Sequence, residues 1–297
     1  NLYSKICAWE NLELAYYKAR RGKRGLAPAA SFERKLEDNL VALQDALLSQ
    51  TYAPGKYHSF YIHDPKKRLI SAAPFRDRVV HHALCNIIEP IFERSFIDDS
   101  YANRVGQGTH RALDRCQQFS RRYRYALQLD IVQYFPSIDH AVLRETLARR
   151  IGDEAVLKLC DVIVESGRGV LAEEYNMDDF ILFADDKRTL WGWRKEIVEY
   201  LARLRVTLHI ERVHPRPVAE GVMFLGFNVF PTHRLLKAKK AISFRRKLKG
   251  MHCQMARGEI GFGSLHASVR GWVNHVRYGD TWGLRRAILG ANPITWN

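Results

Sequence analysis

Three aspartates stand next to apolar segments, where a carboxylate is costly unless it has a partner. Asp130 ends one apolar run, and Asp178 and Asp179 directly precede another, Phe180–Phe183. A carboxylate beside a buried strand needs compensation, and two adjacent carboxylates repel each other unless a cation lies between them. Mg²⁺ prefers such oxygen ligands together with substrate phosphates. The three residues therefore predict a two-metal site, in which one ion activates a 3′-hydroxyl and the other stabilises a leaving pyrophosphate.

Aspartate pairs also occur in this sequence where no chemistry is required. Asp185 and Asp186 precede a helical stretch, where they would cap the helix and complement its dipole. Asp98 and Asp99 stand in a polar turn before Tyr101. A pair of aspartates is therefore weak evidence by itself.

For Asp130 the competing interpretation is a strand-end residue that caps the following turn. Ser137 and Asp139 already suit that capping role. The metal-site hypothesis thus depends on the combination of Asp130 with the apolar strand that follows Asp179.

Positive charge is in excess and is clustered along the chain. The 297 residues include 47 Lys+Arg and 32 Asp+Glu, which gives a net charge of +15. Such an excess favours a polyanion partner, because neutralised phosphates release counterions. A solvated helix face is the alternative, but interleaved aromatics favour a surface that follows a phosphate backbone. The clusters are Lys18, Arg20, Arg21, Lys23 and Arg24; Arg121, Arg122 and Arg124; and Arg234, Lys237, Lys239, Lys240, Arg245, Arg246, Lys247, Lys249 and Arg257.

Composition narrows the class of protein. Hydrophobic residues make up 46% of the chain, which argues against disorder, and the length suggests two structural units. No apolar run is long enough to span a bilayer, and no signal peptide is recognisable. The first residue is not Met, so we expect the natural start to be missing or processed. The five scattered cysteines contain no C-x-x-C pair, which favours a reducing cytoplasm over a disulfide or zinc framework.

Periodicity predicts the elements that must position these residues. We expect an N-terminal helix capped by Ser31, a hairpin whose connecting tip spans 64–68, and a long helix that breaks at Pro90. A strand should end near Asp130. The predicted helices are 31–50, 75–96, 139–150 and 187–204, and the predicted strands are 58–63, 69–71, 125–132 and 180–183 with 173–177 as the partner of the last.

Two further groups of residues admit two interpretations each. His81, His82 and Cys85 resemble half of a metal site, but no second half follows, so packing within a helix is favoured. Trp191 is expected in the core. Trp272 is compatible with either packing or stacking on a base.

Six segments in order resemble one family. The sequence is similar to prokaryotic reverse transcriptases of the branch that includes diversity-generating retroelements, retrons and group II intron enzymes, and the first of these matches best. The segments are RLISAAPFRDRVVHHALCNIIEPIFE (68–93), SYANRVGQGTHRAL (100–113), LQLDIVQYFPSID (127–139), MDDFILFADD (177–186), GVMFLGFNVFPTH (221–233) and SVRGWVNHVRYGDTWGL (268–284).

The resemblance implies an α+β right-hand polymerase. Fingers with N-terminal helices would occupy 1–125, an antiparallel palm 126–232 and a helical thumb 233–297. It assigns catalysis to Asp130, Asp178 and Asp179, which would bind two Mg²⁺ ions, or Mn²⁺, with Ile131. It assigns dNTP binding to Lys67, Arg68, Ile131, Arg212 and Phe135, the last as a gate against a ribose 2′-hydroxyl. It assigns nucleic-acid binding to Arg104, Gly106, Gly108, Arg245, Arg246, Lys249, Trp272 and His275, with a primer grip over 221–227.

The sequence departs from the family pattern at three places. Asn176 stands where the family usually has Tyr, which is displaced to Tyr175, and Arg212 replaces a Lys. A Gly-rich strand and a long palm helix are absent after Val170. Either the protein has lost this element or the printed sequence omits it. We favour omission, because the three aspartates are retained and loss would leave a palm face bare to water.

The resemblance implies an RNA-directed DNA polymerase in the cytoplasm of a prokaryote, without a membrane partner. Its partners would be an RNA template, cDNA and dNTPs, with a small accessory protein or self-association as a further option. The role would be retrohoming or antiphage defence, which neighbouring genes would separate. A non-catalytic, maturase-like RNA-binding protein on the same fold is the main alternative. A two-metal nuclease is the third, and Phe135 argues against it.

Overall fold

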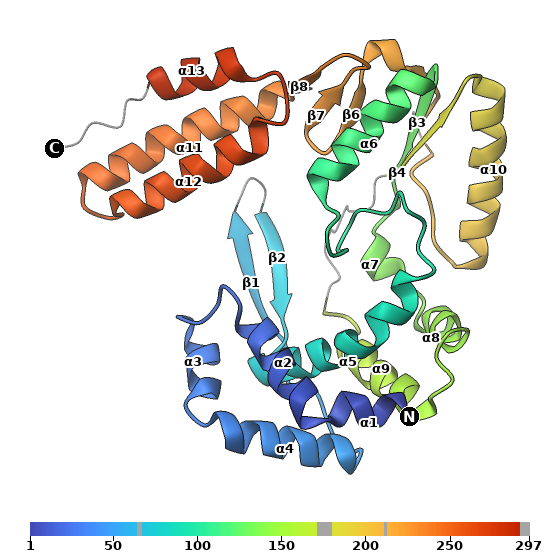
Figure 1. The fold of residues 1–297 in the computed structure, drawn as a ribbon, viewed down its shortest axis with the longest axis vertical. Helices are drawn as coiled ribbons and strands as arrows, with labels where there is room; N and C mark the ends of the chain where they lie inside the picture. Colours follow the sequence, from blue (N-terminus) through green and yellow to red (C-terminus); the bar gives the residue numbers. More distant parts are fainter. Residues whose placement is uncertain (64–66, 171–179, 211–212, 292–297) are drawn as a thin grey trace. The chain divides into compact units, whose positions relative to one another are not determined.

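The computed structural model describes residues 1–63, 67–170, 180–210 and 213–291, and it divides into two compact units. Unit 1 comprises 1–97, 130–178 and 198–208, and unit 2 comprises 98–129, 179–197 and 209–297. Helices and small antiparallel sheets make up both units, which is compatible with the expected α+β class (Figure 1). The expected fingers, palm and thumb segments remain a prediction.

Unit 1 is a helical assembly built around one apolar core. Its largest fully buried side chains come from helices far apart in the chain, and they include Ile6, Leu12, Tyr16, Leu40 and Leu47. The predicted period of residues 31–50 is confirmed over the second of its two helices. The helices are α1 (Leu2–Cys7), α2 (Trp9–Arg20), α3 (Ala27–Glu33), α4 (Leu36–Leu48), α5 (Phe75–Glu93), α7 (Tyr134–Ser137), α8 (His140–Ala148) and α9 (Glu154–Ser166).

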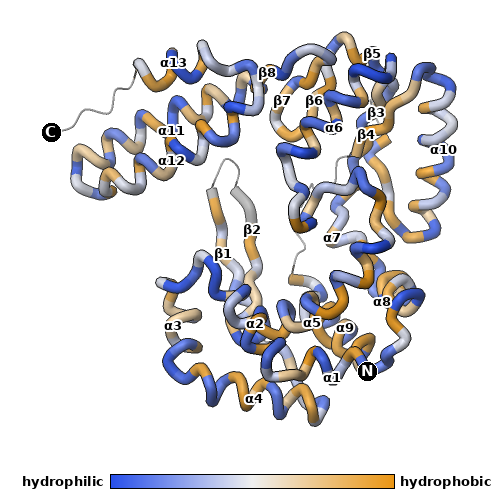
Figure 2. The backbone as a smooth tube through the Cα atoms, in the orientation of Figure 1, coloured by the Kyte–Doolittle hydropathy of each residue, from blue (hydrophilic) through white to orange (hydrophobic). Residues whose placement is uncertain are grey.

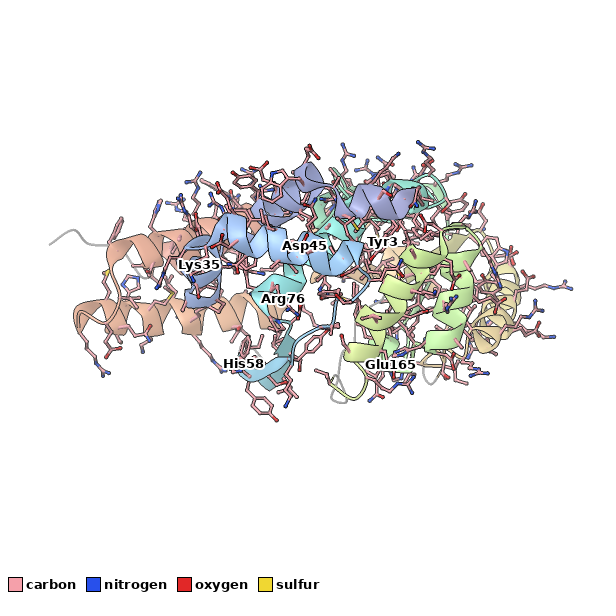
Figure 3. The ribbon with its side chains drawn as sticks, turned by 90° about the horizontal axis from the view of Figure 1, so that it is seen from below. Tyr3, Lys35, Asp45, His58, Arg76 and Glu165 are labelled. Atoms are coloured by element: carbon pink, nitrogen blue, oxygen red, sulfur yellow. The ribbon has the colours of Figure 1, made fainter. Side chains whose placement is uncertain are left out.

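One carboxylate joins the start of the chain to its middle. Asp153 Oδ2 accepts the amides of Leu2 at 2.9 Å and Tyr3 at 3.0 Å, while its Oδ1 accepts the amide of Ala155 at the start of α9. The hydroxyl of Tyr3, which is labelled in Figure 3, donates to the carbonyl of Leu47 at 2.6 Å. Asp153 is therefore the N-cap of α9 and also accepts the first two amides of α1, whose own N-cap is Asn1.

Two helix boundaries differ from the prediction. Ser31 lies inside α3 and is not a cap, because Pro28 in the first turn starts that helix earlier. Helix α5 continues through Pro90 to Glu93. Pro90 stands in the last turn, so it removes one hydrogen bond from a helix that buried Val79 and Val80 already hold.

The predicted hairpin of unit 1 is confirmed, but its second strand begins at Lys67, inside the predicted tip of 64–68. Strands β1 (His58–His63) and β2 (Lys67–Ala72) pair antiparallel, with Phe60 opposite Ile70. The hydroxyls of Ser59 and Ser71 lie 2.8 Å apart across the pair. Residues 64–66 of the connecting tip lie outside the described residues.

The described residues of unit 2 form two three-stranded sheets and a group of C-terminal helices. The first sheet has the order β4-β3-β5 and the second β6-β7-β8. Strand β4 is hydrophobic along its length, whereas α11 mixes polar and apolar residues (Figure 2). The elements are α6 (Thr109–Arg122), β3 (Tyr125–Leu129), β4 (Phe180–Ala184), β5 (Arg216–Pro217), β6 (Val222–Phe224), β7 (Phe227–Val229), β8 (Arg234–Leu236), α11 (Ala238–Ala256), α12 (Phe262–Val276) and α13 (Trp282–Gly290).

Helix α10 (Lys187–Arg203) contributes its first part to unit 2 and its last part to unit 1. Asp186 accepts the amide of Thr189 at 2.8 Å, so its predicted capping role is confirmed. Leu190 is the buried residue of this helix, and Trp191 is 40% exposed. The expectation of a core position for Trp191 is therefore wrong.

Within the described residues, no helix is long and apolar enough to cross a membrane.

His81 and His82 lie in α5, and burial is the main cause that lowers the pKa of each imidazole. Both histidines therefore pack within a helix, as the sequence favoured. No group of three metal-ligating side chains occurs among the described residues.

Candidate functional site

The residues predicted to bind metal adjoin two strands in the sequence. Strand β3 ends just before Asp130, and strand β4 begins just after Asp179. They pair antiparallel from Tyr125 opposite Ala184 to Leu129 opposite Phe180. Asp130 directly follows this ladder and is half-buried. Asp178 and Asp179 lie outside the described residues. Leu127 and Leu129 are completely buried, so the apolar run predicted before Asp130 does form a strand of the core.

The chain after Asp130 is fixed by backbone contacts in unit 1. Ile131 is buried and forms an antiparallel bridge with Leu208, and the amide of Val132 donates to the carbonyl of Thr207 at 2.9 Å. Gln133 then adopts a left-handed conformation, with φ at 45°. This conformation is uncommon for a residue other than glycine.

The left-handed residue leads into α7, which presents the predicted gate. Phe135 is 44% exposed, and its ring meets that of Tyr134 edge-on at 5.3 Å. Asp139 then caps α8 by accepting the amides of Ala141 and Val142. The aromatic side chain is thus held five residues beyond Asp130 on a short, defined turn.

The predicted triphosphate contacts are described only in part. Lys67 and Arg68 begin β2, where their backbones pair with His63 and Ile62, but their side chains lie outside the description. Arg212, Tyr175 and Asn176 are outside the described residues altogether. Their assigned roles remain predictions.

The predicted template loop is closed on itself in unit 2. The amide of Gly108 donates to the carbonyl of Tyr101 at 3.1 Å, and Arg104 Nη1 donates to the carbonyl of Ser100 at 3.0 Å. Gly106 and Gly108 have φ of 75° and 107°, which explains why the loop needs glycine. Its backbone is therefore ordered by internal hydrogen bonds.

Asp99, for which the sequence indicates no chemical role, anchors this loop. Asp99 accepts hydrogen bonds from Nε and Nη2 of Arg115 and from the Tyr101 hydroxyl. The Arg115 hydrogen bond is the main cause that lowers the pKa of Asp99. Arg115 also lies over the ring of Phe119, 4.3 Å from its centroid. The Asp98–Asp99 pair thus contains a structural residue that its sequence context did not reveal.

The segment predicted as a primer grip forms a tight hairpin. Strands β6 and β7 are joined by Leu225 and Gly226, with φ of 48° and 90°. Two residues of positive φ define the turn that matches the twist of paired strands. Gly221 has no room for a side chain, because a Cβ atom there would lie 2.3 Å from Oδ1 of Asn228.

Helix α11 separates a buried side from a basic side. Ala241, Phe244 and Leu248 are buried, whereas the predicted phosphate contacts Arg245, Arg246 and Lys249 are exposed. This spacing leaves the three cations available to solvent on a helix whose apolar residues pack against α12.

The two aromatic residues predicted to bind nucleic acid are engaged in packing. Trp272 stacks on Phe244 with the ring centroids 4.2 Å apart and the planes 1° from parallel. His275 lies 5.3 Å from the ring of Phe227, and burial is the main cause that lowers its pKa. One face of the Trp272 ring is therefore occupied, and contact with nucleic acid remains a prediction for both.

The basic run contains one residue whose role the sequence did not indicate. Arg234 is 11% exposed at its side chain and donates to Asp114 at 2.7 Å and to Gln117 at 2.8 Å. It is therefore not available for phosphates. The sequence carries no signal for this role, because α6 is polar along most of its length and its acceptors Asp114 and Gln117 are more than 100 residues away.

Comparison with known proteins finds relatives that include an intron maturase and a group II intron-encoded protein. No family model matches the chain. It is 29% identical over 176 residues to nuclear intron maturase 2, mitochondrial, of Arabidopsis thaliana. The matched region covers 54% of this chain and 24% of the maturase. It is 30% identical over 144 residues to protein YkfC of Escherichia coli, covering 46% and 37%. It is 27% identical over 138 residues to the group II intron-encoded protein LtrA of Lactococcus lactis, covering 46% and 22%.

The chain thus spans at most 37% of the length of these relatives. Similarity at this level supports the reverse transcriptase-related family that the motifs indicate. The particular branch, the activity and the partners belong to the proposal that follows.

Proposed function

We propose that the chain is an RNA-directed DNA polymerase that transfers nucleotides from dNTPs to a primer 3′-hydroxyl. The observation that carries this proposal is the register of β3 and β4, which ends with Leu129 opposite Phe180. Asp130 follows Leu129 in the sequence and Asp179 precedes Phe180. In the sequence, the two aspartates therefore flank the last described pair of this ladder. The similarity to LtrA supports the same family.

In this proposal the donor set fits Mg²⁺, since Asp130, Asp178 and Asp179 offer hard carboxylate oxygens. Ile131 has a buried apolar side chain and can offer a metal only its backbone oxygen. When bound, two such ions activate the primer hydroxyl and stabilise the leaving pyrophosphate. Mn²⁺ would satisfy the same ligands.

The other residues would position substrates. Phe135 would exclude a ribose 2′-hydroxyl, and Lys67, Arg68 and Arg212 would neutralise the incoming triphosphate. The loop around Arg104 would hold the template, and the exposed cations of α11 would follow the duplex backbone. Fingers, palm and thumb would then correspond to 1–125, 126–232 and 233–297, with a non-coding RNA as template in a retroelement or a defence system.

Primer extension tests the proposal directly. The full chain, a primer annealed to RNA, dNTPs and Mg²⁺ should give extended DNA, and Asp130→Asn should reduce the rate by more than about a hundredfold. Asp186→Asn is the matched control, because Asp186 caps a helix and should be dispensable for extension. Absence of extension by the wild-type chain, or an unchanged rate in Asp130→Asn, would refute the proposal.

A maturase-like function is the second candidate, favoured because the relatives include a nuclear intron maturase. In that case the chain would bind structured RNA without synthesis. Asp130→Asn would then leave both RNA binding and biological activity intact, whereas a polymerase would lose activity while retaining binding. Measuring both properties in this one variant separates the two functions.

A further inference from the structure

One face of α6 carries a row of polar residues that point to a single task. His110, Asp114, Gln117 and Arg121 follow one another at intervals of four, three and four residues, so they share one face of the helix. Gln117 is buried although it is polar. A buried amide is costly unless its hydrogen bonds are satisfied, so its partners define what this face holds.

The C-terminal half of this row, Gln117 and Arg121, binds the connection between β7 and β8. Gln117 Nε2 donates to the carbonyl of Phe230 at 3.0 Å, and Arg121 Nε donates to the carbonyl of Pro231 at 2.7 Å. Both carbonyls belong to the four residues between the strands. The loop is thereby fixed to α6 over more than 100 residues of sequence.

Arg234, at the start of β8, completes the arrangement. Its Nη2 donates to Asp114 Oδ1 and to Gln117 Oε1, while Nη1 lies 3.5 Å from the carbonyl of Tyr278. Its own carbonyl accepts the amide of Asp280 at 2.7 Å. One residue therefore contacts α6, its own sheet and the turn that links α12 to α13.

The same turn is packed closely against the sheet and α6. A Cβ atom at Gly279 would lie 2.8 Å from the ring of Phe227 and 2.9 Å from the carbonyl of Arg234. The rings of His110 and Tyr278 stack 3.5 Å apart and 9° from parallel. The turn thus has one closely defined position in unit 2.

The basic helix begins directly beyond this junction. Only Lys237 separates β8 from α11, and its amide donates to the carbonyl of Gly226 in the β6–β7 turn. The direction of α11, and with it the position of Arg245, Arg246 and Lys249, therefore depends on how β8 and the 277–281 turn are held.

We propose that Arg234 is a positioning residue that orients the basic helices α11–α13 on the β6–β8 sheet, so that their exposed cations meet a nucleic-acid duplex together. This inference rests on the proposed function in that the duplex is a primer–template. Arg suits the position better than Lys, because Nη2 of its planar fork reaches two acceptors on α6 while Nη1 lies near the carbonyl of Tyr278. Arg234 itself contacts no phosphate.

Duplex binding and primer extension measured over a range of salt concentrations test this role. Arg234→Met should weaken binding of an RNA–DNA duplex about five- to tenfold and shorten the extension products, because helices that are no longer held in place must be ordered when the duplex binds. The salt dependence of binding should keep its slope, since no phosphate contact is lost. The rate of the first nucleotide addition at saturating primer–template should stay within about twofold.

Arg246→Met is the matched comparison, because it removes an exposed cation of the same charge from α11. It should lower the salt slope by about one, as expected for a phosphate contact. Asp114→Asn should reproduce the Arg234→Met effect in part, and the double variant should be no weaker than Arg234→Met alone. If Arg234→Met does not fold, Asp114→Asn and Arg234→Lys provide the same comparison, and each should bind the duplex more weakly than the wild type with an unchanged salt slope.

The outcomes are distinct. A reduced salt slope in Arg234→Met would make Arg234 a phosphate ligand and overturn the proposal, as would unchanged affinity and product length. A merely structural residue would lower the first-addition rate and binding alike, which would also overturn it. A wild-type chain that binds duplex but never extends it would refute the polymerase proposal, while the binding measurements still decide the role of Arg234.

Discussion

Arg115 holds Asp99 with two hydrogen bonds, one from Nε at 2.7 Å and one from Nη2 at 3.2 Å. This pairing connects α6 to the start of the loop that contains Gly106 and Gly108. Together with the contacts of Arg234, it gives α6 two polar attachments on different faces. One fixes the 99–108 loop, and the other fixes the β7–β8 connection and the turn after α12.

The first prediction concerns the loop. Asp99→Ala should increase proteolytic cleavage and amide exchange within 99–108 and should cost about 1 kcal/mol of stability, because the pair is partly exposed. The neighbouring Asp98→Ala provides the control, since Asp98 is exposed. Equal protection of the loop in both variants would show that Asp99 does not anchor it.

The second prediction concerns the exposed ring of Phe135. If it acts as a gate, Phe135→Ala should raise ribonucleotide incorporation relative to deoxyribonucleotide incorporation by about tenfold or more, which corresponds to ~1.4 kcal/mol of steric discrimination. Primer extension with each nucleotide type measures the ratio. Tyr134→Phe, which removes only a hydroxyl from the adjacent ring, should leave the ratio unchanged.

The third prediction concerns a buried carboxylate in unit 1. Asp77 is 1% exposed and accepts hydrogen bonds from the Tyr52 hydroxyl at 3.0 Å and the Gly55 amide at 2.7 Å. Burial is the main cause that raises the pKa of Tyr52, with the Asp77 charge second. Asp77→Ala should lower the free energy of unfolding by about 3 kcal/mol, and Tyr52→Phe by about 1 kcal/mol.

Urea denaturation measures both changes. Asp45→Ala serves as the control, because Asp45 is exposed on α4 and alanine favours a helix. A cost for Asp77→Ala no larger than that of Asp45→Ala would contradict the assigned network.

The fourth prediction concerns pH. The amide of Tyr3 is the main cause that lowers the pKa of Asp153 below its ordinary value, and the amides of Val156, Leu2 and Ala155 also contribute. A folded pKa below the unfolded one means that the ionised carboxylate stabilises the fold. This stabilisation is fully present above the unfolded pKa of about 3.9 and is lost as pH falls through the folded pKa.

The melting temperature of Asp153→Asn should therefore lie below that of the wild type near pH 7. The difference should shrink as the pH is lowered below about 4, where the wild-type carboxylate becomes protonated. Thermal melts at a series of pH values give the comparison. A difference that stays constant down to pH 2 would mean that the charge of Asp153 is not what matters.

The fifth prediction compares Gly279, in the turn between α12 and α13, with Gly283 in α13. Gly279→Ala brings a methyl group against Phe227 and the Arg234 carbonyl and should cost about 1–3 kcal/mol. Gly283→Ala meets no atom within 4 Å in α13 and should stabilise the chain by about 0.5–1 kcal/mol. Opposite signs in denaturant titrations are expected, and two equal effects would contradict the close approach at Gly279.

Hydrophobic periodicity predicted elements well wherever burial decides the structure. The helix at 140–148 with its Asp139 cap, and the strands at 125–129 and 180–184, agree with the alternation and spacing of apolar residues. Pro90 misled the prediction because a proline in the last turn removes little from a helix that is already held. Trp191 misled it because hydrophobic character alone does not decide which side of α10 is covered.

Long-range polar contacts could not be predicted in the same way. Arg234 belongs to a basic run whose other members α11 exposes, and nothing near it in sequence indicates acceptors 117 and 120 residues away. The anchoring role of Asp99 could not be predicted for a similar reason, since Arg115 becomes its partner only once α6 forms. Among the candidate site residues, the sequence predicted the strand before Asp130, whereas the attachments of the template loop required the structure.

Asp153 has a consequence for the order of events on the ribosome. The amides of Leu2 and Tyr3 wait for an acceptor that is synthesised 150 residues later. Until α9 has emerged, the first amides of α1 lack this acceptor. The hydrogen bond from the Tyr3 hydroxyl to the Leu47 carbonyl then forms while the core is still incomplete. The helices of unit 1 that precede α9 are therefore expected to depend on chaperone protection until α9 has left the exit tunnel.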